Sequence, residues 1–440
     1  MTVFLLNFMA VLLVLMMIIQ GISRRVDLLS LRNMFLFGFI VYQLSSPAMA
    51  LYNEVFPLFQ IYTPEATGKK YAFFAFLYLA IFLFSYHRLK FTPWVARKFS
   101  GPPREMGDTF LLGLAMFLVC AALMLRLLGP SIPLIRNVSI QTAIALVTVA
   151  SALASWVWGN RRSNPAVVAM AVFIVAASLG IGLIGAFTRR PLLGILMGLA
   201  WGAYHRRFKF MPPTKMMINL LPLVVFAAVA VSAFTAIRDS RKSGTWTPQE
   251  TMRKMTQANV GAGAQDILSG QSCGAASLWC VENYPHRVEP RLFFTLRFIP
   301  MFYVPRALWP DKPMSLANHL SIIARVEGVA RGTITLPPGM IGYAAAEGGL
   351  MAIILYGLFF GQFLRFFDSL IQNNPFNPIL ILPCGCVLGQ ALGLARGDVA
   401  TFTNLMVLEF VSTYVVILIA GKLFGSRTPQ AYYAPWPQTR

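Results

Sequence analysis

The sequence predicts an all-α, polytopic helical membrane protein. Of its 440 residues, 57% are apolar and only 12% are charged, whereas a soluble domain usually carries about 25% charged residues. The mean hydropathy is +0.64, and apolar stretches approach the roughly 20 residues that cross a bilayer. A transmembrane barrel would instead show alternation over strands of about ten residues. These observations exclude a soluble globular, disordered or coiled-coil protein.

Apolar segments long enough to be interpreted as spans recur along the chain, and we predict about eleven transmembrane spans. The first has neither a basic leader region nor a small-residue cleavage site, which indicates an uncleaved anchor. A large loop at 238–338 divides an N-terminal bundle of about eight spans at 1–237 from a three-span bundle at 339–421 and a tail at 422–440. The predicted spans are 3–20, 34–52, 71–86, 110–128, 138–158, 166–186, 191–204, 216–237, 339–362, 376–395 and 402–421.

The net charge of +21 is distributed unevenly between alternate loops. Lysine and arginine concentrate in loops 21–33, 87–109, 159–165 and 205–215, which share one side of the membrane. The positive-inside rule assigns that side, and the tail with it, to the cytoplasm. The amino terminus and the loop 238–338 then lie outside. Because no soluble basic domain is present, nucleic acid is not an expected partner.

The cysteines and histidines argue against a metal centre. Cys273 and Cys280 lie in the large outer loop, where an oxidising periplasm favours a disulfide between them. Only His286 lies nearby, and a zinc site needs three or four protein ligands. The sequence has no P-loop, no dinucleotide-binding fingerprint and no Gly-x-Ser-x-Gly motif, so we expect neither a metal nor a cofactor.

Charged residues concentrate in three outer turns. The guanidinium group of arginine binds phosphate in a bidentate geometry, and prolines hold a backbone rigid. Each turn also has an ordinary structural interpretation: contact with lipid phosphates, a turn stapled by tryptophan, or a simple ion pair. The turns are 185–191 with Arg189 and Arg190, 304–313 with Arg306, Trp309, Asp311 and Lys312, and 395–399 with Arg396 and Asp398.

Three charged residues fall inside predicted spans. Arg126 lies near the outer end of the fourth span, Glu347 in the ninth and Glu409 in the eleventh. Ionisable groups in a membrane are costly and therefore mark candidate functional sites. We expect these three to bind substrate, with an internal ion pair as the alternative.

The turn Pro305-Arg-Ala-Leu-Trp-Pro-Asp-Lys-Pro313, inside a large late outer loop, resembles the O-antigen polymerase family, also called oligosaccharide repeat-unit polymerases. In that family a Gly-x-x-Arg-type turn lies upstream and an Arg-Gly-Asp-like turn downstream. Here these are 185–190 and 396–398, and the resemblance covers the chain from about 180 to 400. Where the family often has a Glu-x-Tyr element, this chain has Gly342-Tyr343, and its acid is Glu347.

The resemblance implies a metal-independent glycosyltransferase of the bacterial inner membrane, with its active site facing the periplasm. Such an enzyme joins oligosaccharide units carried on undecaprenyl diphosphate into a surface polysaccharide or exopolysaccharide. Its partners would be that lipid-linked oligosaccharide, the bilayer, and the chain-length regulator and flippase of the same pathway. The resemblance assigns catalysis to arginines that stabilise the diphosphate leaving group. The catalytic residues would be Arg306, Arg189, Arg190, Arg396 and Asp398.

Two alternatives remain open from sequence. An O-antigen ligase would have similar outer arginines and would be expected to use an outer-loop histidine, for which His286 and His319 are available. A transporter or flippase of an anionic lipid-linked sugar would place charges through the membrane midplane and show an internal repeat. The charges here gather in the outer half, which favours an enzyme. The sequence leaves sugar identity and linkage open.

Overall fold

A computed structural model describes residues 1–24, 26–99, 106–132, 135–161, 163–184, 189–212, 214–216, 218, 219, 222, 225, 229, 273–324 and 335–423. These residues form helices and no strand, as the sequence predicts. Eight helices among them are long and apolar enough to cross a membrane. They are Thr2–Ile22, Leu31–Asn53, Pro64–Arg88, Asp108–Ser131, Val138–Asn160, Pro165–Gly182, Leu350–Asn373 and Val399–Leu423.

Seven predicted spans coincide with these helices. They correspond to α1 (Thr2–Ile22), the composite α2 (Leu31–Phe39), η1 (Ile40–Ser45) and α3 (Ser46–Asn53), α4 (Pro64–Arg88), α6 (Asp108–Leu128), α7 (Arg136–Asn160), α8 (Pro165–Leu183) and α19 (Val399–Leu423). Within the second predicted span, Ser45, Ser46 and Pro47 mark the point where the π-helix η1 gives way to α3. Local π geometry of this kind often lies at functional sites.

The ninth predicted span was placed wrongly. Residues 339–362 do not form one helix, because Gly349 has φ 57° and ψ −125° and divides α16 (Gly339–Gly348) from α17 (Leu350–Asn373). Glycine adopts such a left-handed φ without a side-chain clash. The membrane-length helix is therefore α17, and Glu347 lies on the short helix before it.

Three other predicted spans are not among the candidate spans. Helix α9 (Arg189–Arg206) carries arginines at both ends, which lowers its hydropathy. Helix α18 (Pro378–Leu394) has 17 residues and is slightly too short. Most of 216–237 lies outside the described residues.

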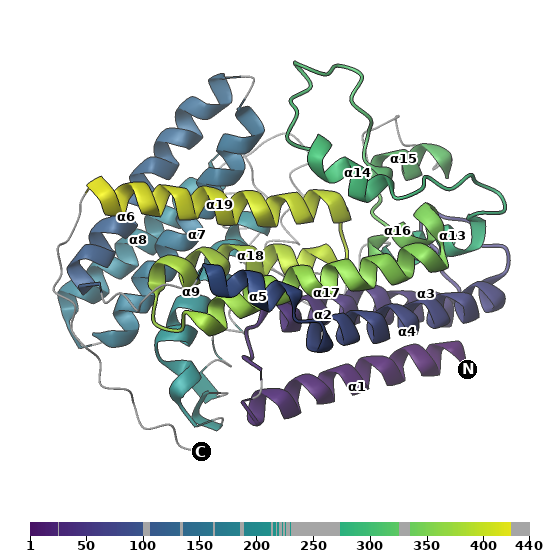
Figure 1. The fold of residues 1–440 in the computed structure, drawn as a ribbon, viewed down its shortest axis with the longest axis horizontal. Coiled ribbons are helices and arrows are strands. Elements are labelled where there is room, and N and C mark those ends of the chain that lie inside the picture. The colour runs from purple at the N-terminus through teal and green to yellow at the C-terminus, as the bar shows by residue number, and fades with distance from the viewer. Residues whose placement is uncertain are drawn as a thin grey trace, which may run out of the picture.

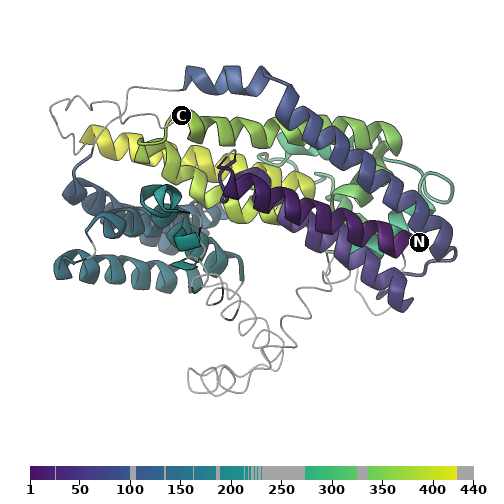
Figure 2. The same cartoon turned by 90° about the horizontal axis from the view of Figure 1, so that it is seen from below.

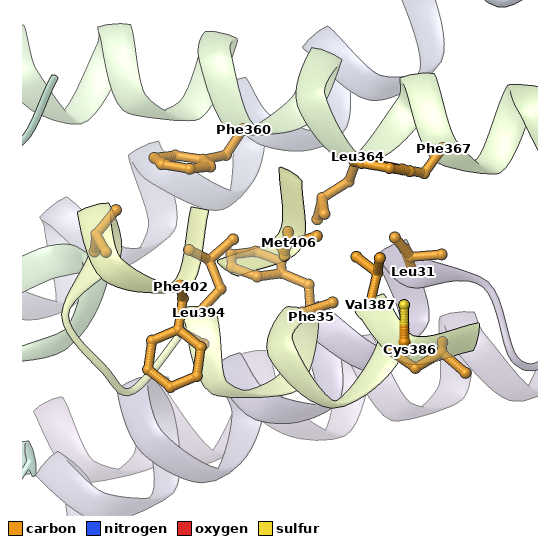
Figure 3. Close-up of a cluster of buried hydrophobic side chains, with 14 of the residues drawn as sticks. Leu31, Phe35, Phe360, Leu364, Phe367, Cys386, Val387, Leu394, Phe402 and Met406 are labelled. Atoms are coloured by element: carbon orange, nitrogen blue, oxygen red, sulfur yellow. The ribbon is translucent and has the colours of Figure 1, made fainter. Parts of the chain in front are cut away.

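One part of the hydrophobic core lies where α2, α17, α18 and α19 pack together (Figure 3). Side chains from all four helices interdigitate there, so burial of apolar surface holds segments far apart in sequence together. Helices α6 to α9 form a second group, and α7 and α9 join it to α18. The residues labelled in Figure 3 are Leu31, Phe35, Phe360, Leu364, Phe367, Cys386, Val387, Leu394, Phe402 and Met406.

The described part of the predicted outer loop folds into the end of this bundle. It comprises α13 (Cys273–Asn283), α14 (Phe294–Met301) and α15 (Leu316–Ile323). Helix α14 is short and has Pro300 inside it. Figure 1 shows α13 and α16 at the same end of the bundle as α3 and the amino terminus, and we call it the α13 end.

Charged side chains attach the last turn of α13 to the beginning of α4. Glu282 accepts hydrogen bonds from the backbone N–H groups of Tyr62 (3.0 Å) and Thr63 (2.6 Å), just before α4 begins. In return, Lys70 Nζ donates to the carbonyl oxygen of Val281 at 2.9 Å, near the end of α13. These bonds satisfy backbone groups that helix termini leave unpaired. All α13 residues except Glu282 are buried, so this part of the loop is not a separate domain.

Candidate functional site at the α13 end

The turn between α18 and α19 carries Arg396 and Asp398 and is fixed by several polar contacts. The carbonyl oxygen of Ala395 accepts hydrogen bonds from Met340 N at 3.3 Å and Gln43 Nε2 at 3.0 Å. The thiol of Cys273 points at the Arg396 carbonyl oxygen, 3.6 Å away. Three distant parts of the chain therefore hold one short turn.

Gln43, on η1, connects these parts. Its Nε2 donates to the Ala395 carbonyl oxygen, and its Oε1 accepts from Tyr71 Oη at 3.1 Å and from Ile341 N at 3.3 Å. Ile341 N belongs to the first turn of α16, where backbone donors lack helical partners. We call Gln43, Tyr71, Ile341 and Ala395 the Gln43 network. The Gln43 side chain is fully buried.

The preceding residue, Tyr42, contacts the same turn. The Arg396 guanidinium carbon lies 5.6 Å from the centroid of the Tyr42 ring, a cation–π distance. Gly339 completes the fit, because its φ is 66° and a Cβ there would lie 2.0 Å from Gln43 Nε2 and 2.7 Å from the Ala395 oxygen. Sequence reasoning missed this role for η1. The sequence signal for this role was Gln43 itself, a polar residue just before Ser45, Ser46 and Pro47 inside a predicted span.

Asp398 precedes the first turn of α19. Its carbonyl oxygen accepts from Phe402 N at 2.9 Å, and its Oδ1 lies 3.5 Å from Thr401 N. Burial raises the pKa of this carboxyl above its usual value, and hydrogen bonds from Ser315 and Thr401 offset only part of that rise. Ser315 immediately precedes α15, so Asp398 lies beside the segment that follows Lys312.

Glu347 is fully buried and anchors α14. Its Oε2 accepts from Thr295 N at 2.9 Å, and its other oxygen accepts from the Thr295 hydroxyl. Tyr356 Oη also donates to this carboxyl. Burial raises the pKa of Glu347 to about 7, against the opposing effect of these hydrogen bonds. These contacts position α14 and the segment after it, and binding of substrate by Glu347 stays a prediction.

The predicted segment 304–313 follows α14 directly. Arg306 is exposed, with Nη1 3.4 Å from the Pro310 carbonyl oxygen. Lys312 Nζ donates to the carbonyl oxygens of Phe302 and Val304 at 2.9 and 3.0 Å, so it caps the end of α14. Burial and the neighbouring Arg306 lower the pKa of Lys312. Asp311 is exposed and Trp309 is half-buried.

Tyr303 connects this segment to the last helix. Its hydroxyl donates to the Asn404 carbonyl oxygen of α19 at 3.3 Å. The segment with Arg306 and the turn with Arg396 are thus both attached near the start of α19. Two of the three predicted turns are therefore attached to the beginning of α19.

The remaining predicted site residues lie elsewhere or outside what the structure describes. Arg126 Nε donates at 2.8 Å to the Ile184 carbonyl oxygen, which follows the end of α8. This contact caps the end of α8, and binding of substrate by Arg126 stays a prediction. Glu409 accepts from Gln390 Nε2 at 2.6 Å, between α18 and α19. Arg189 and Arg190 begin α9, but their side chains lie outside the described residues.

The predicted disulfide is absent from the structure. Cys273 and Cys280 are both buried, free thiols on α13. Seven residues of α-helix separate them by about 10 Å, whereas bridged cysteines have Cα atoms at most about 7 Å apart. The prediction was wrong because it treated 273–280 as a loop.

The two histidines of the predicted outer loop differ in their surroundings. His319 Nε2 lies 2.5 Å from Arg291 Nη2, and burial followed by the charge of Arg291 lowers the pKa of this imidazole. His286 is exposed. Within the described ranges, no three His, Cys, Asp or Glu residues gather closely enough to hold a metal ion.

Comparisons of the chain with protein-family models, curated protein sequences and solved structures find no match.

Proposed function

We propose that the chain is an inner-membrane polymerase that joins oligosaccharide units carried on undecaprenyl diphosphate. The α13 end would face the periplasm, on the side opposite the basic loops. The observation that carries this proposal is that the segment with Arg306 and the turn with Arg396 and Asp398 are both attached to the beginning of α19. Glycosyl transfer from a diphosphate needs a base for the acceptor hydroxyl and positive charge for the leaving group, and a carboxylate and arginines supply these two functions.

In this reaction the acceptor hydroxyl gives its proton to a carboxylate. Its oxygen bonds to the anomeric carbon of the growing chain while the bond from that carbon to the diphosphate oxygen breaks. The diphosphate departs with the bonding electron pair, and Arg306 and Arg396 stabilise its charge. No metal need take part in these steps.

Asp398 is better suited than Glu347 to the role of base. Glu347 has no exposed surface and already accepts from Thr295 and Tyr356. Asp398 is only partly buried, and the rise in its pKa increases its basicity. Glu347 then acts as a positioning residue for α14.

A strain that lacks the chain tests the proposal against its alternatives. A polymerase defect leaves lipid-linked single repeat units and no long polysaccharide. A ligase defect instead accumulates long polymer on the lipid carrier, and a flippase defect leaves single units facing the cytoplasm. Either of the latter two results would overturn the proposal. Restoration by the wild-type gene, and not by Asp398→Asn, would support the assigned base.

A further inference from the structure

Helix α5 (Phe91–Lys98) lies beside the second half of α17, away from the candidate site. Thr92 N and Oγ1 both donate to Gln362 Oε1, at 3.3 and 3.0 Å. The ring of Phe99 meets that of Phe366 edge-on, with centroids 6.1 Å apart. Gln362 Nε2 donates in turn to the Ser85 carbonyl oxygen at 2.6 Å. The helix is therefore docked on the bundle rather than free in solution, and Figure 2 shows it along one edge.

The outward face of α5 is strongly aromatic. Phe91 is 67% exposed, Trp94 54% and Phe99 55%. Contact of such large apolar side chains with water is unfavourable relative to their burial in an apolar environment. Tryptophan beside phenylalanine on a short amphipathic helix is typical of the boundary between lipid headgroups and acyl chains.

Position in the chain supports the same location. Only Leu89 and Lys90 separate α5 from the end of α4, a candidate membrane span. A helix that begins so soon after a span ends must lie near the membrane surface.

The charges around α5 have one sign. Arg88, Lys90, Arg97 and Lys98 are all exposed, and residues 86–99 contain no acidic side chain. Lys98 Nζ lies 3.9 Å from the centroid of the Trp94 ring, so the aromatic face and the cations form one surface. We define these four residues with Phe91, Trp94 and Phe99 as the α5 surface.

We infer that the α5 surface binds the headgroups of acidic phospholipids. Its aromatic side chains insert below the phosphate level, and its four cations attract lipid phosphates. A basic residue near an anionic leaflet contributes about 1 kcal/mol, roughly fivefold in local lipid concentration. This inference is independent of the proposed polymerase activity.

Quenching of Trp94 fluorescence by brominated lipids tests this directly. The full chain is reconstituted in phosphatidylcholine nanodiscs that contain the same small fraction of brominated phosphatidylglycerol or of brominated phosphatidylcholine. The signal of Trp94 is the difference between the wild type and Trp94→Phe. We expect brominated phosphatidylglycerol to quench Trp94 severalfold more strongly than brominated phosphatidylcholine does. High salt should reduce this difference, and inorganic phosphate at matched ionic strength should reduce it no further.

The double substitution of Lys90→Gln and Lys98→Gln removes two of the four cations and should therefore weaken the preference for brominated phosphatidylglycerol severalfold. Lys422→Gln, at an exposed lysine near the end of α19, is the matched control and should retain the preference. Equal quenching of the wild type by both lipids would overturn the acidic-lipid preference. Absence of quenching by either would show that α5 does not contact lipid at all.

Discussion

Replacement of Gln43 by leucine tests how the Arg396 turn is held. Leucine keeps a side chain of similar size but has no polar atoms. Two partners keep a second hydrogen bond, because Tyr71 Oη also donates to the Gln43 backbone oxygen at 2.8 Å and the Ala395 oxygen still accepts from Met340 N. Ile341 N loses the acceptor that Gln43 Oε1 provides.

The expected cost follows from these contacts. A buried donor left without an acceptor costs about 1–3 kcal/mol, and the lost bond to Ala395 adds about 1 kcal/mol. Gln43→Leu should therefore lose about 2–4 kcal/mol of stability. Gln43→Glu should be worse, because a carboxylate cannot donate to the Ala395 oxygen and its charge would be buried.

The assay is thermal denaturation of the purified protein in detergent, in which the fraction of protein that remains monodisperse is measured at each temperature. Gln372→Leu is the matched control, since Gln372 is exposed near the end of α17. The midpoint of Gln43→Leu should fall by several degrees below that of the control. Equal midpoints for the two variants would refute the role of the Gln43 network.

Three further predictions concern charged residues. Arg306→Ala should abolish long polysaccharide while the protein level stays normal, since an exposed side chain contributes little to stability. Lys422→Ala should change neither chain length nor protein level. Normal chain length in Arg306→Ala would remove Arg306 from the site. The raised pKa of Glu347, about 7 against an ordinary 4.5, means that the folded state binds the extra proton. Wild-type stability relative to Glu347→Gln should therefore fall by up to about 3 kcal/mol as the pH rises between these values, and parallel pH profiles of the denaturation midpoint would contradict this. Burial alone would raise the pKa of Glu282, but bonds from Tyr62 and Thr63 lower it overall. The stability that Glu282 contributes should thus be lost as the pH falls below about 4.5, and Glu282→Gln should lack this acid-side loss in the same assay.

The membrane-spanning helices were the most predictable part of the fold. Long apolar segments such as 3–20 and 402–421 have few stable alternatives in lipid, because only a helix satisfies its own backbone there. The displaced ninth span shows the limit of this signal. Apolar residues flank Glu347, Gly348 and Gly349 on both sides, and the break depends on a positive φ at Gly349 that composition does not reveal.

The site was less predictable because tertiary contacts determine its roles. The turns with Arg306 and Arg396 stood out as charged residues in apolar surroundings. The importance of Gln43 did not, since its partners Tyr71 and Ile341 are 28 and 298 residues away. The disulfide prediction failed for a related reason: local spacing suggested a loop where Cys273 and Cys280 lie on one helix.

The measurement that most directly tests the central claim uses purified protein in nanodiscs. Its substrate is the lipid-linked repeat unit extracted from the strain that lacks the chain. The wild type should convert single units into a ladder of longer lipid-linked chains and release undecaprenyl diphosphate, without added metal or nucleotide. Arg396→Ala and Asp398→Asn should form no ladder, whereas Lys422→Ala should match the wild type. Failure of the wild type to lengthen the units, or an unchanged ladder from both site variants, would contradict the account.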